Sequence, residues 1–168
     1  MEETNADSRL GFIEIVNFQD FSVRGGLLVT DVQTRPYEFR VTSPIKPTQL
    51  QQILYGSTLT EFIFAELICV PLLKACKEEI NLVIVNQHFL LNMRPKVSIP
   101  VIYINKQNEK NGNHNLFDYQ IHKNFKTEEE SAKYYIDLLA ENTDIFEPFE
   151  RIKTAVNEVH LNKLDEKT

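Results

Sequence analysis

Three short runs rich in apolar and β-branched residues open this chain and predict β-strands at residues 11–18, 23–33 and 37–42. The connections between them are short, so we expect an antiparallel meander. One face of the first strand carries Phe12, Glu14, Val16 and Phe18, which places Glu14 among apolar neighbours. Inside the second run, Gly25 and Gly26 are interpreted as a bend or bulge rather than a phosphate-binding turn, because no helix begins after them.

Residues 58–105 carry the longest apolar helical pattern, followed by two runs typical of buried strands. Thr58 stands three residues before Glu61, the spacing of a capping box, and predicts the start of a helix. Its apolar face is expected to hold Leu59, Phe62, Ile63, Leu67, Val70, Leu73 and Cys76. Pro71 removes one backbone hydrogen bond and is expected to kink the helix near Leu67. An alternative reads residues 62–70 as a strand and begins the helix at Pro71.

The two runs after this helix, residues 81–86 and 98–104, are β-branched and apolar on successive positions. Strands that are covered on both faces, as in parallel sheets, have this pattern. Two short helices complete the middle of the chain, one at residues 49–55 after a Thr48 cap and one at residues 87–94. Gly56 is expected to end the first of them.

The last third of the chain begins with a polar segment. Residues 105–115 are nearly all Asn, Lys, Gln and Gly, so we predict a mobile loop over 105–126. Residues 127–163 are predicted to form C-terminal helices, the first opened by a capping box at Thr127 and the second capped by Asp144. The polar residues 1–10 are predicted to be disordered.

Composition adds bounds to this pattern. The length of 168 residues and 42% hydrophobic content predict one domain, residues 1–168. A net charge of −6 argues against electrostatic binding of nucleic acid or an anionic membrane over the whole surface. A local basic groove remains an alternative. Cys69 and Cys76 lie on one predicted helix, about 10 Å apart along its axis, too far to form a disulfide.

These thiols indicate a reducing compartment. No signal peptide is visible at the start of the sequence. The mostly apolar residues 62–76 are interrupted by charges and too short to span a bilayer. We therefore expect a cytoplasmic protein that does not contact a membrane.

The order of elements resembles the ribonuclease H-like fold: α/β with a mixed sheet, in which a three-strand antiparallel meander is followed by αβαβ and C-terminal helices. Within that fold, the middle of the chain resembles endonuclease V. The resemblance rests on residues whose order is like that family's: Tyr55-Gly56, Leu59, Glu66, Pro71-Leu-Leu73, the strand ending at Asn86, and Arg94.

This resemblance implies a magnesium site, because enzymes of the fold hold two cations with carboxylates on the first strand, on or near the first helix, and at the end of the next strand. The corresponding candidates for catalytic residues here are Glu14, Glu66 and Asn86. Asn86 brings no charge, and Glu66 stands farther from Pro71 than the family's pattern has it. The acidic site therefore looks incomplete. If the fold is right, Glu14 and Glu66 are expected to approach each other, with Asp20 or Asp31 as further possible ligands.

Other chemistries have less support in the sequence. The four histidines are scattered without zinc-ligand spacing, and no cysteine has a histidine near it in sequence. Asn86 and His88 follow a predicted parallel strand, where ligand crevices occur, but a polar turn is the favoured interpretation. We assign no metal site from the sequence and expect no cofactor, with magnesium only under a nuclease interpretation.

Two interaction surfaces are predicted. A basic groove for nucleic acid is expected from Arg24, Arg35, Arg40, Lys46, Arg94 and Lys96, set against the simpler interpretation of an ordinary solvated surface. Aromatic residues beyond the needs of a small sheet predict contact with a protein partner or a second copy through Tyr134, Tyr135, Phe146 and Phe149.

Two hypotheses from different classes follow. The favoured one is a non-catalytic ribonuclease H-like interaction or scaffold subunit of a larger, nucleic-acid-handling assembly, chiefly because of Asn86. The alternative is a metal-dependent nuclease of the endonuclease V-like type. A small-molecule site at the strand ends is a third option without positive support.

Overall fold

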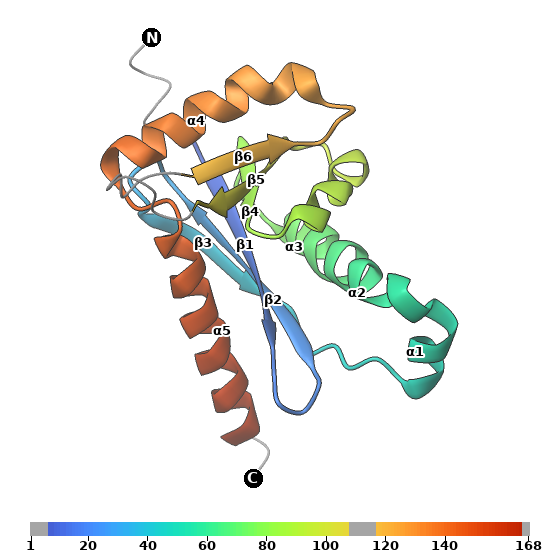
Figure 1. Ribbon diagram of the computed structural model, residues 1–168. Helices are drawn as coiled ribbons and strands as arrows, with labels where there is room; N and C mark the ends of the chain where they lie inside the picture. The colour runs from blue at the N-terminus through green and yellow to red at the C-terminus, as the bar shows by residue number, and fades with distance from the viewer. Residues whose placement is uncertain (1–6, 108–116, 166–168) are drawn as a thin grey trace.

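A six-stranded sheet forms the centre of the molecule (Figure 1). The computed structural model describes residues 7–107 and 117–165, with the side chains of 163–165 left out. The strand order is β3-β2-β1-β4-β5-β6. Neighbouring strands are antiparallel except for β1, β4 and β5, which run parallel to one another. The strands are β1 (Leu10–Asn17), β2 (Val23–Thr30), β3 (Pro36–Val41), β4 (Leu82–Val85), β5 (Val101–Lys106) and β6 (Phe117–Ile121).

The predicted meander and the two buried parallel strands are confirmed. Leu10 and Phe12 of β1 are fully buried, and β4 is buried along its whole length. The mixed α/β class predicted from the sequence is therefore correct. Helices cover both faces of these central strands, which explains why their apolar residues follow one another without alternation.

The two glycines of β2 allow helices to approach both faces of the sheet. A Cβ atom on Gly25 would lie 2.1 Å from Ile68 Cγ2, and one on Gly26 would lie 2.5 Å from Ile152 Cγ2. The predicted bend or bulge at this pair is wrong, because both residues pair regularly with β1 and the register shift lies between Val29 and Thr30. Close helix packing is the reason for glycine here.

A long helical segment covers one face of the sheet. Its parts are α1 (Gln49–Tyr55), a 3-10 turn η2 (Gly56–Thr58), α2 (Leu59–Glu61), a π-helix η3 (Phe62–Cys69) and α3 (Val70–Ala75). The helical interpretation of residues 62–70 is confirmed and the strand alternative is wrong. Thr58 makes no capping hydrogen bond, whereas Thr48 and Gln51 form a capping box at the start of α1.

The π-helix replaces the predicted kink ahead of Pro71. Proline lacks the N–H for an α-helical bond and crowds the carbonyl four residues earlier, at Leu67, so a wider turn relieves the strain. The wider turn also changes which residues face the sheet. Phe64 and Ile68 are buried while Leu67 is 38% exposed, so the predicted apolar face is wrong at Leu67.

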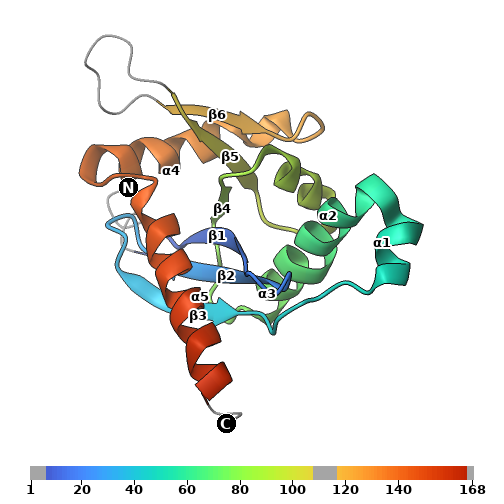
Figure 2. The same cartoon turned by 60° about the horizontal axis from the view of Figure 1, so that its bottom comes forward.

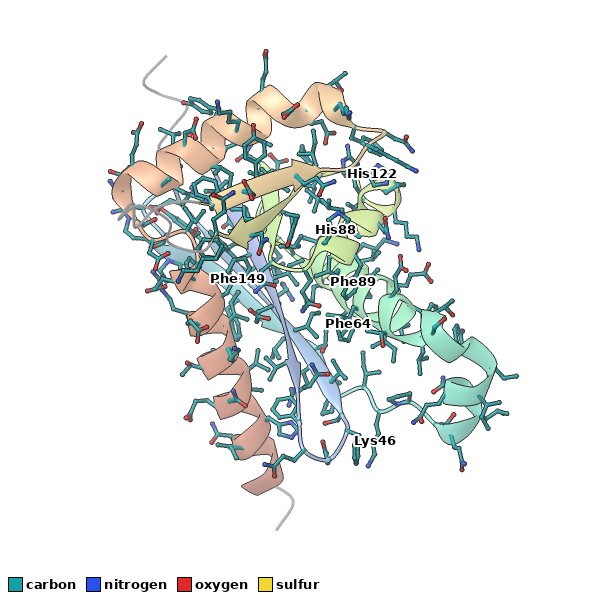
Figure 3. All side chains as sticks on the ribbon, viewed as in Figure 1. Lys46, Phe64, His88, Phe89, His122 and Phe149 are labelled. Atoms are coloured by element: carbon teal, nitrogen blue, oxygen red, sulfur yellow. The ribbon has the colours of Figure 1, made fainter. Side chains whose placement is uncertain are left out.

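The same face is completed by a 3-10 helix, η4 (His88–Lys96), in the position of the predicted short helix. Phe64 and Phe89 lie close to each other across this layer, with ring centroids 5.6 Å apart (Figure 3). Ile13 and Ile15 of β1 point into this layer.

The other face carries α4 (Glu129–Asn142), which follows a 3-10 turn η5 (Lys126–Glu128), and α5 (Glu147–Asp165). Figures 1 and 2 show these two helices on the side of the sheet away from α2 and α3. Phe12 and Val16 of β1 point into this second layer, so the predicted division of β1 into two faces is confirmed. Asp144 accepts a hydrogen bond from Phe146 N–H ahead of α5, and the capping box predicted at Thr127 is not formed.

Two predictions of disorder need correction. Residues 105–126 hold the end of β5 and all of β6, an antiparallel pair, so the predicted mobile loop is wrong for those strands. Phe117, Tyr119 and Ile121 contact the second layer, which gives this polar segment an apolar anchor. At the N-terminus, Ser8 and Leu10 are buried although residues 1–10 are predicted to be disordered. Residues 1–6 and 108–116 lie outside the described part of the chain.

Within the described residues, one helical segment, Gln49–Ala75, is long and apolar enough to cross a membrane by length and composition. The apolar run expected from the sequence, residues 62–76, is too short to span a bilayer. In the structure the helical segment begins earlier, with α1, and is therefore longer than predicted. Ile63, Ile68 and Leu73 of this segment are buried against the sheet, whereas the residues of α1 at its start are not buried.

Candidate functional site

The structure brings two of the three candidate catalytic residues together at the ends of adjacent parallel strands. Ile13 of β1 pairs with Val85 of β4, so Glu14 and Asn86 follow side by side. Asn86 Nδ2 donates a hydrogen bond to Glu14 Oε2 at 2.8 Å, and the N–H of Ile15 donates to Glu14 Oε1 at 3.1 Å. Both carboxylate oxygens of Glu14 therefore have donors.

Glu14 is a buried acid, with 7% of its surface exposed. Burial raises the pKa of this carboxyl above its ordinary value, because the charged form loses hydration. The hydrogen bonds from Asn86 and Ile15 and the charge of Lys153 act in the opposite direction, and Glu150 raises the pKa further. The net direction of the pKa is upward, so burial outweighs the two hydrogen bonds and the charge of Lys153.

A pocket of about 440 Å³ opens beside this pair, between the strand ends and α5. Its charged residues besides Glu14 are Lys106, Asp144, Glu147, Glu150 and Lys153. Phe149 lies between α5 and the sheet in Figure 3 and lines the pocket together with Phe146. Sequence reasoning missed Glu147, Glu150 and Lys153, although their spacing puts them near one another on the last helix. The sequence did not indicate which face of the last helix turns toward β1.

Glu66 lies on the opposite face of the sheet from Glu14. On β2, Gly26 pairs with Glu14 and its Cβ direction meets α5, whereas Gly25 faces Ile68 of the helix that carries Glu66. Glu66 forms an ion pair with Lys96 of η4 and lines a different pocket. The prediction that Glu14 and Glu66 approach each other is therefore wrong. The strand's alternation sends Glu14 away from that helix.

The other acidic candidates serve local structure. Asp31 accepts hydrogen bonds from the N–H groups of Gln33 and Arg35 and pairs with the Arg35 side chain at 2.7 Å. Asp20 accepts from the N–H and hydroxyl of Ser22 in the β1–β2 turn. Each closes its own turn and neither lines the pocket beside Glu14.

The donor set at this site does not fit the magnesium that the ribonuclease H-like fold implies. Magnesium needs several anionic or neutral oxygens in octahedral geometry. Asn86 presents its amide donor to Glu14, and Lys153 lies close enough to Glu14 to lower its pKa by its charge. Across the described part of the chain, no group of three or more His, Cys, Asp or Glu side chains is arranged to hold a metal ion.

Two of the predicted basic residues are buried. Arg24 has no exposed surface: its Nε donates to Thr42 O at 2.9 Å and its Nη1 lies 3.3 Å from His160 Nδ1. Arg94 donates to both carboxylate oxygens of Glu128 and stacks on Phe125, with 4.0 Å from its Cζ to the ring centroid. Both act inside the fold and neither is free to bind a phosphate.

The other predicted basic residues are mostly neutralised. Arg35 pairs with Asp31, Arg40 with Glu38, and Lys96 with Glu66. Lys46 is exposed and takes part in none of the ion pairs formed between described residues; Figure 3 places it near the β1–β2 turn, far from Phe149. The predicted basic groove is therefore wrong: these residues do not form one positively charged surface.

The predicted aromatic interface also changes. Phe149 is 3% exposed and packs edge-to-face on Phe12, with ring centroids 5.6 Å apart. Phe146 and Tyr135 are partly buried against the same core, and Tyr134 is 46% exposed. Phe149 is thus a core residue and not a partner-binding one, because α5 needs it to cover β1.

The two thiols, His88 and His160 lie in surroundings that do not activate them as nucleophiles. Burial raises the pKa of the Cys69 thiol to about 12 and raises that of Cys76 as well. His88 contacts Tyr103 edge-to-face rather than an acid, with ring centroids 5.4 Å apart. His160 stacks on Phe18 with 3.7 Å between centroids. These groups have structural surroundings, as expected from the sequence for the cysteines.

No protein-family model matches the chain, and no curated protein matches it in sequence. Among solved structures, it is similar to human endonuclease V, with 12% identity and a TM-score of 0.47 over 66% of this chain and 51% of that one. It is also similar to endonuclease V of Ciona intestinalis in complex with inosine-containing DNA, with 14% identity and a TM-score of 0.43 over 61% and 47% of the two chains. Argonaute of Marinitoga piezophila, in complex with a 5′-OH guide RNA, gives 8% identity and a TM-score of 0.35 over 66% and 18%.

The chain spans about half the length of the endonuclease V structures that it matches. The sheet itself, an antiparallel meander whose first strand is continued by two parallel strands, has the arrangement expected of the ribonuclease H-like fold. At the level of the fold, this chain resembles endonuclease V.

Proposed function

We propose that this chain is a non-catalytic ribonuclease H-like module that acts by binding other macromolecules, as a subunit of a larger, nucleic-acid-handling assembly. The observation that carries the proposal is the hydrogen bond from Asn86 Nδ2 to Glu14 Oε2, 2.8 Å long, at the strand ends. This hydrogen bond occupies a carboxylate oxygen that a nuclease would use to coordinate a metal cation. Lys153 supplies a positive charge beside the same carboxyl.

The separation of Glu66 from Glu14 supports the same proposal. Hydrolysis assisted by two metal ions needs carboxylates that converge on one point. Here one candidate faces α5 and the other is paired with Lys96 on the far face of the sheet.

The two free thiols agree with the reducing, cytoplasmic location expected from the sequence.

A metal-dependent nuclease of the endonuclease V-like type is the alternative. One observation favours it: Glu147 and Glu150 line the same pocket as Glu14, so acids are present there that the sequence comparison did not consider. Under this alternative, magnesium would have to displace the Asn86 donor and the Lys153 charge from Glu14.

The two functions differ in their response to divalent cations. The full chain is melted with 0 to about 10 mM Mg²⁺ or Mn²⁺, and cleavage of single- and double-stranded nucleic acid is measured in parallel, with Glu14→Gln as the matched control. A bound cation raises the melting temperature by mass action. We expect no such rise and no cleavage beyond that of the control. Metal-dependent cleavage that Glu14→Gln abolishes would overturn the proposal and establish the alternative.

A further inference from the structure

Helix α1 carries the most exposed large apolar side chains of any helix in the described part of the chain. Leu50, Ile53 and Leu54 are 63%, 68% and 73% exposed. Their spacing of three and four residues places them in one stripe along the helix. Figures 1 and 2 show α1 at the edge of the molecule, away from the sheet and from α4 and α5. The stripe faces solvent in the isolated chain.

This helix is too short to be stabilised by itself. It has seven residues and no buried residue, whereas helices below about 12 residues are marginal in water without tertiary packing. The capping box of Thr48 and Gln51 contributes only part of what such a helix needs. Packing of Leu50, Ile53 and Leu54 against another surface would add to the stability of this helix.

The orientation of α1 is fixed before any partner arrives. At the turn that follows it, Tyr55 stacks on Phe62 of the π-helix, with ring centroids 4.7 Å apart. Thr58 Oγ1 donates a hydrogen bond to Tyr55 O at 2.7 Å. A surface that is held in place in the free protein loses less conformational entropy on association.

The chemistry of this segment favours a protein surface over a lipid one. From Pro47 to Thr60 the sequence contains no charged residue, although a quarter of the whole chain is charged. Helices that lie on membranes carry Lys and Arg on their polar face, and this helix has none. The centres of protein interfaces, in contrast, are depleted of charge.

The same chemistry is self-complementary. Two copies that meet along α1 bring no like charges together there, although the chain as a whole carries a net charge of −6. Besides Gln51, whose side chain closes the capping box, the polar neighbours of the stripe are Gln49 and Gln52. Each amide both donates and accepts hydrogen bonds, so amides of this kind pair with copies of themselves.

We infer that α1 is a self-association surface, along which two copies of this chain pair about a two-fold axis through Leu50, Ile53 and Leu54. The contact is isologous, since the same stripe serves both copies. With three apolar side chains per copy, we expect a contact smaller than the roughly 800 Å² per partner of a standard interface, and therefore a weak dimer with a dissociation constant in the micromolar range. The inference holds for a catalytic and for a non-catalytic chain alike.

Sedimentation of the full chain between about 1 and 300 μM tests this inference. We expect the average mass to rise from 19.6 kDa toward twice that value. The double variant Leu50→Glu/Leu54→Glu should weaken the dimer at least about a hundredfold, because two buried leucines per copy are lost. Leu161→Glu, at a leucine of α5 that is 56% exposed, is the matched control and should dimerise normally.

Circular dichroism checks that the variants fold, which is expected because no residue of α1 is buried. A wild-type chain that stays monomeric at 300 μM overturns the inference, and so does a dimer that the double variant leaves intact. Binding of a monomeric chain to vesicles of phosphatidylcholine would assign the stripe to lipid instead.

A second measurement tests the two-fold arrangement. In a Cys76→Ser background, Ile53→Cys places one thiol on the stripe, while Cys69 stays buried. Mild oxidation should give a covalent dimer far faster than it does for Leu161→Cys in the same background. Equal rates for the two variants would contradict pairing along α1.

Discussion

Replacing Asn86 with Asp tests whether the site formed by Glu14 and Asn86 at the strand ends is stable with one carboxyl group but not with two. In the native protein the Asn86 amide donates to Glu14 at 2.8 Å. Asn86→Asp keeps the size of the side chain and exchanges this donor for a second carboxylate. In the variant, this second carboxylate lies next to that of Glu14, which is buried in the native protein.

The cost follows from the competition between repulsion and protonation. Two ionised carboxylates about 4 Å apart repel by about 4 kcal/mol at the effective dielectric constant of such sites. Protonating one of them avoids this repulsion and costs about 3 kcal/mol at pH 7, taking the ordinary glutamate pKa of 4.5 and 1.36 kcal/mol per pH unit. Protonation is the smaller cost, so we expect the free energy of unfolding at pH 7 to fall by about 3 kcal/mol.

The sign of the pH dependence follows from the same pair. Burial raises the pKa of Glu14 in the native protein, and a second carboxylate beside it is expected to raise the pKa of the pair further. The folded variant should therefore be most stable below the ordinary carboxyl pKa of 4.5. Stability is then lost as the pH rises through the raised pKa of the folded pair. The penalty relative to the native protein should be small near pH 4.5 and largest at pH 7 and above.

Urea unfolding of Asn86→Asp between pH 4.5 and pH 8 measures this effect. Asn86→Ser is the control, because it removes the donor without adding charge and should cost about 1 kcal/mol with a much weaker pH dependence. If the Asp variant is no less stable than the Ser variant at pH 7, or if their difference does not shrink toward pH 4.5, the reasoning about Glu14 is wrong.

Three further predictions concern other parts of the molecule. Glu66→Gln removes only an ion pair that is about 40% exposed, so unfolding in urea should change by about 0–1 kcal/mol and Mg²⁺ should have no effect on the difference. Gly25→Ala should destabilise by at least about 1–3 kcal/mol, because its Cβ would lie 2.1 Å from Ile68 Cγ2; in thermal melts the double variant Gly25→Ala/Ile68→Ala should lose less stability than the sum of the two single variants, and additive losses would count against this contact. Titration with a thiol reagent should find Cys69 unreactive in the native protein and Cys76 slowly reactive, since burial raises the pKa of the first to about 12; fast modification of two thiols before unfolding would contradict the packing of this helix.

The sequence by itself determined the elements of the sheet and their class. The continuous apolar runs of β1, β4 and β5 indicate strands that are covered on both faces, because successive strand residues point to opposite faces of the sheet. The same rule placed Glu14 on one face and brought it next to Asn86 once the two strands were taken as parallel neighbours. β6 was missed because its apolar residues alternate with polar ones after a run of Asn, Lys and Gln.

Only the tertiary structure decided which helices meet which face of the sheet. Glu66 is predicted on the correct helix, yet that helix covers the face opposite Glu14, and the sequence carries no signal for this choice. The π-helix ahead of Pro71 changed the helical period and exposed Leu67, and pairing with distant acids removed Arg94 and Lys96 from the predicted basic groove. Local patterns are set by neighbours along the chain, whereas charge pairs and helix faces depend on residues far away in sequence, which meet only when the layers pack.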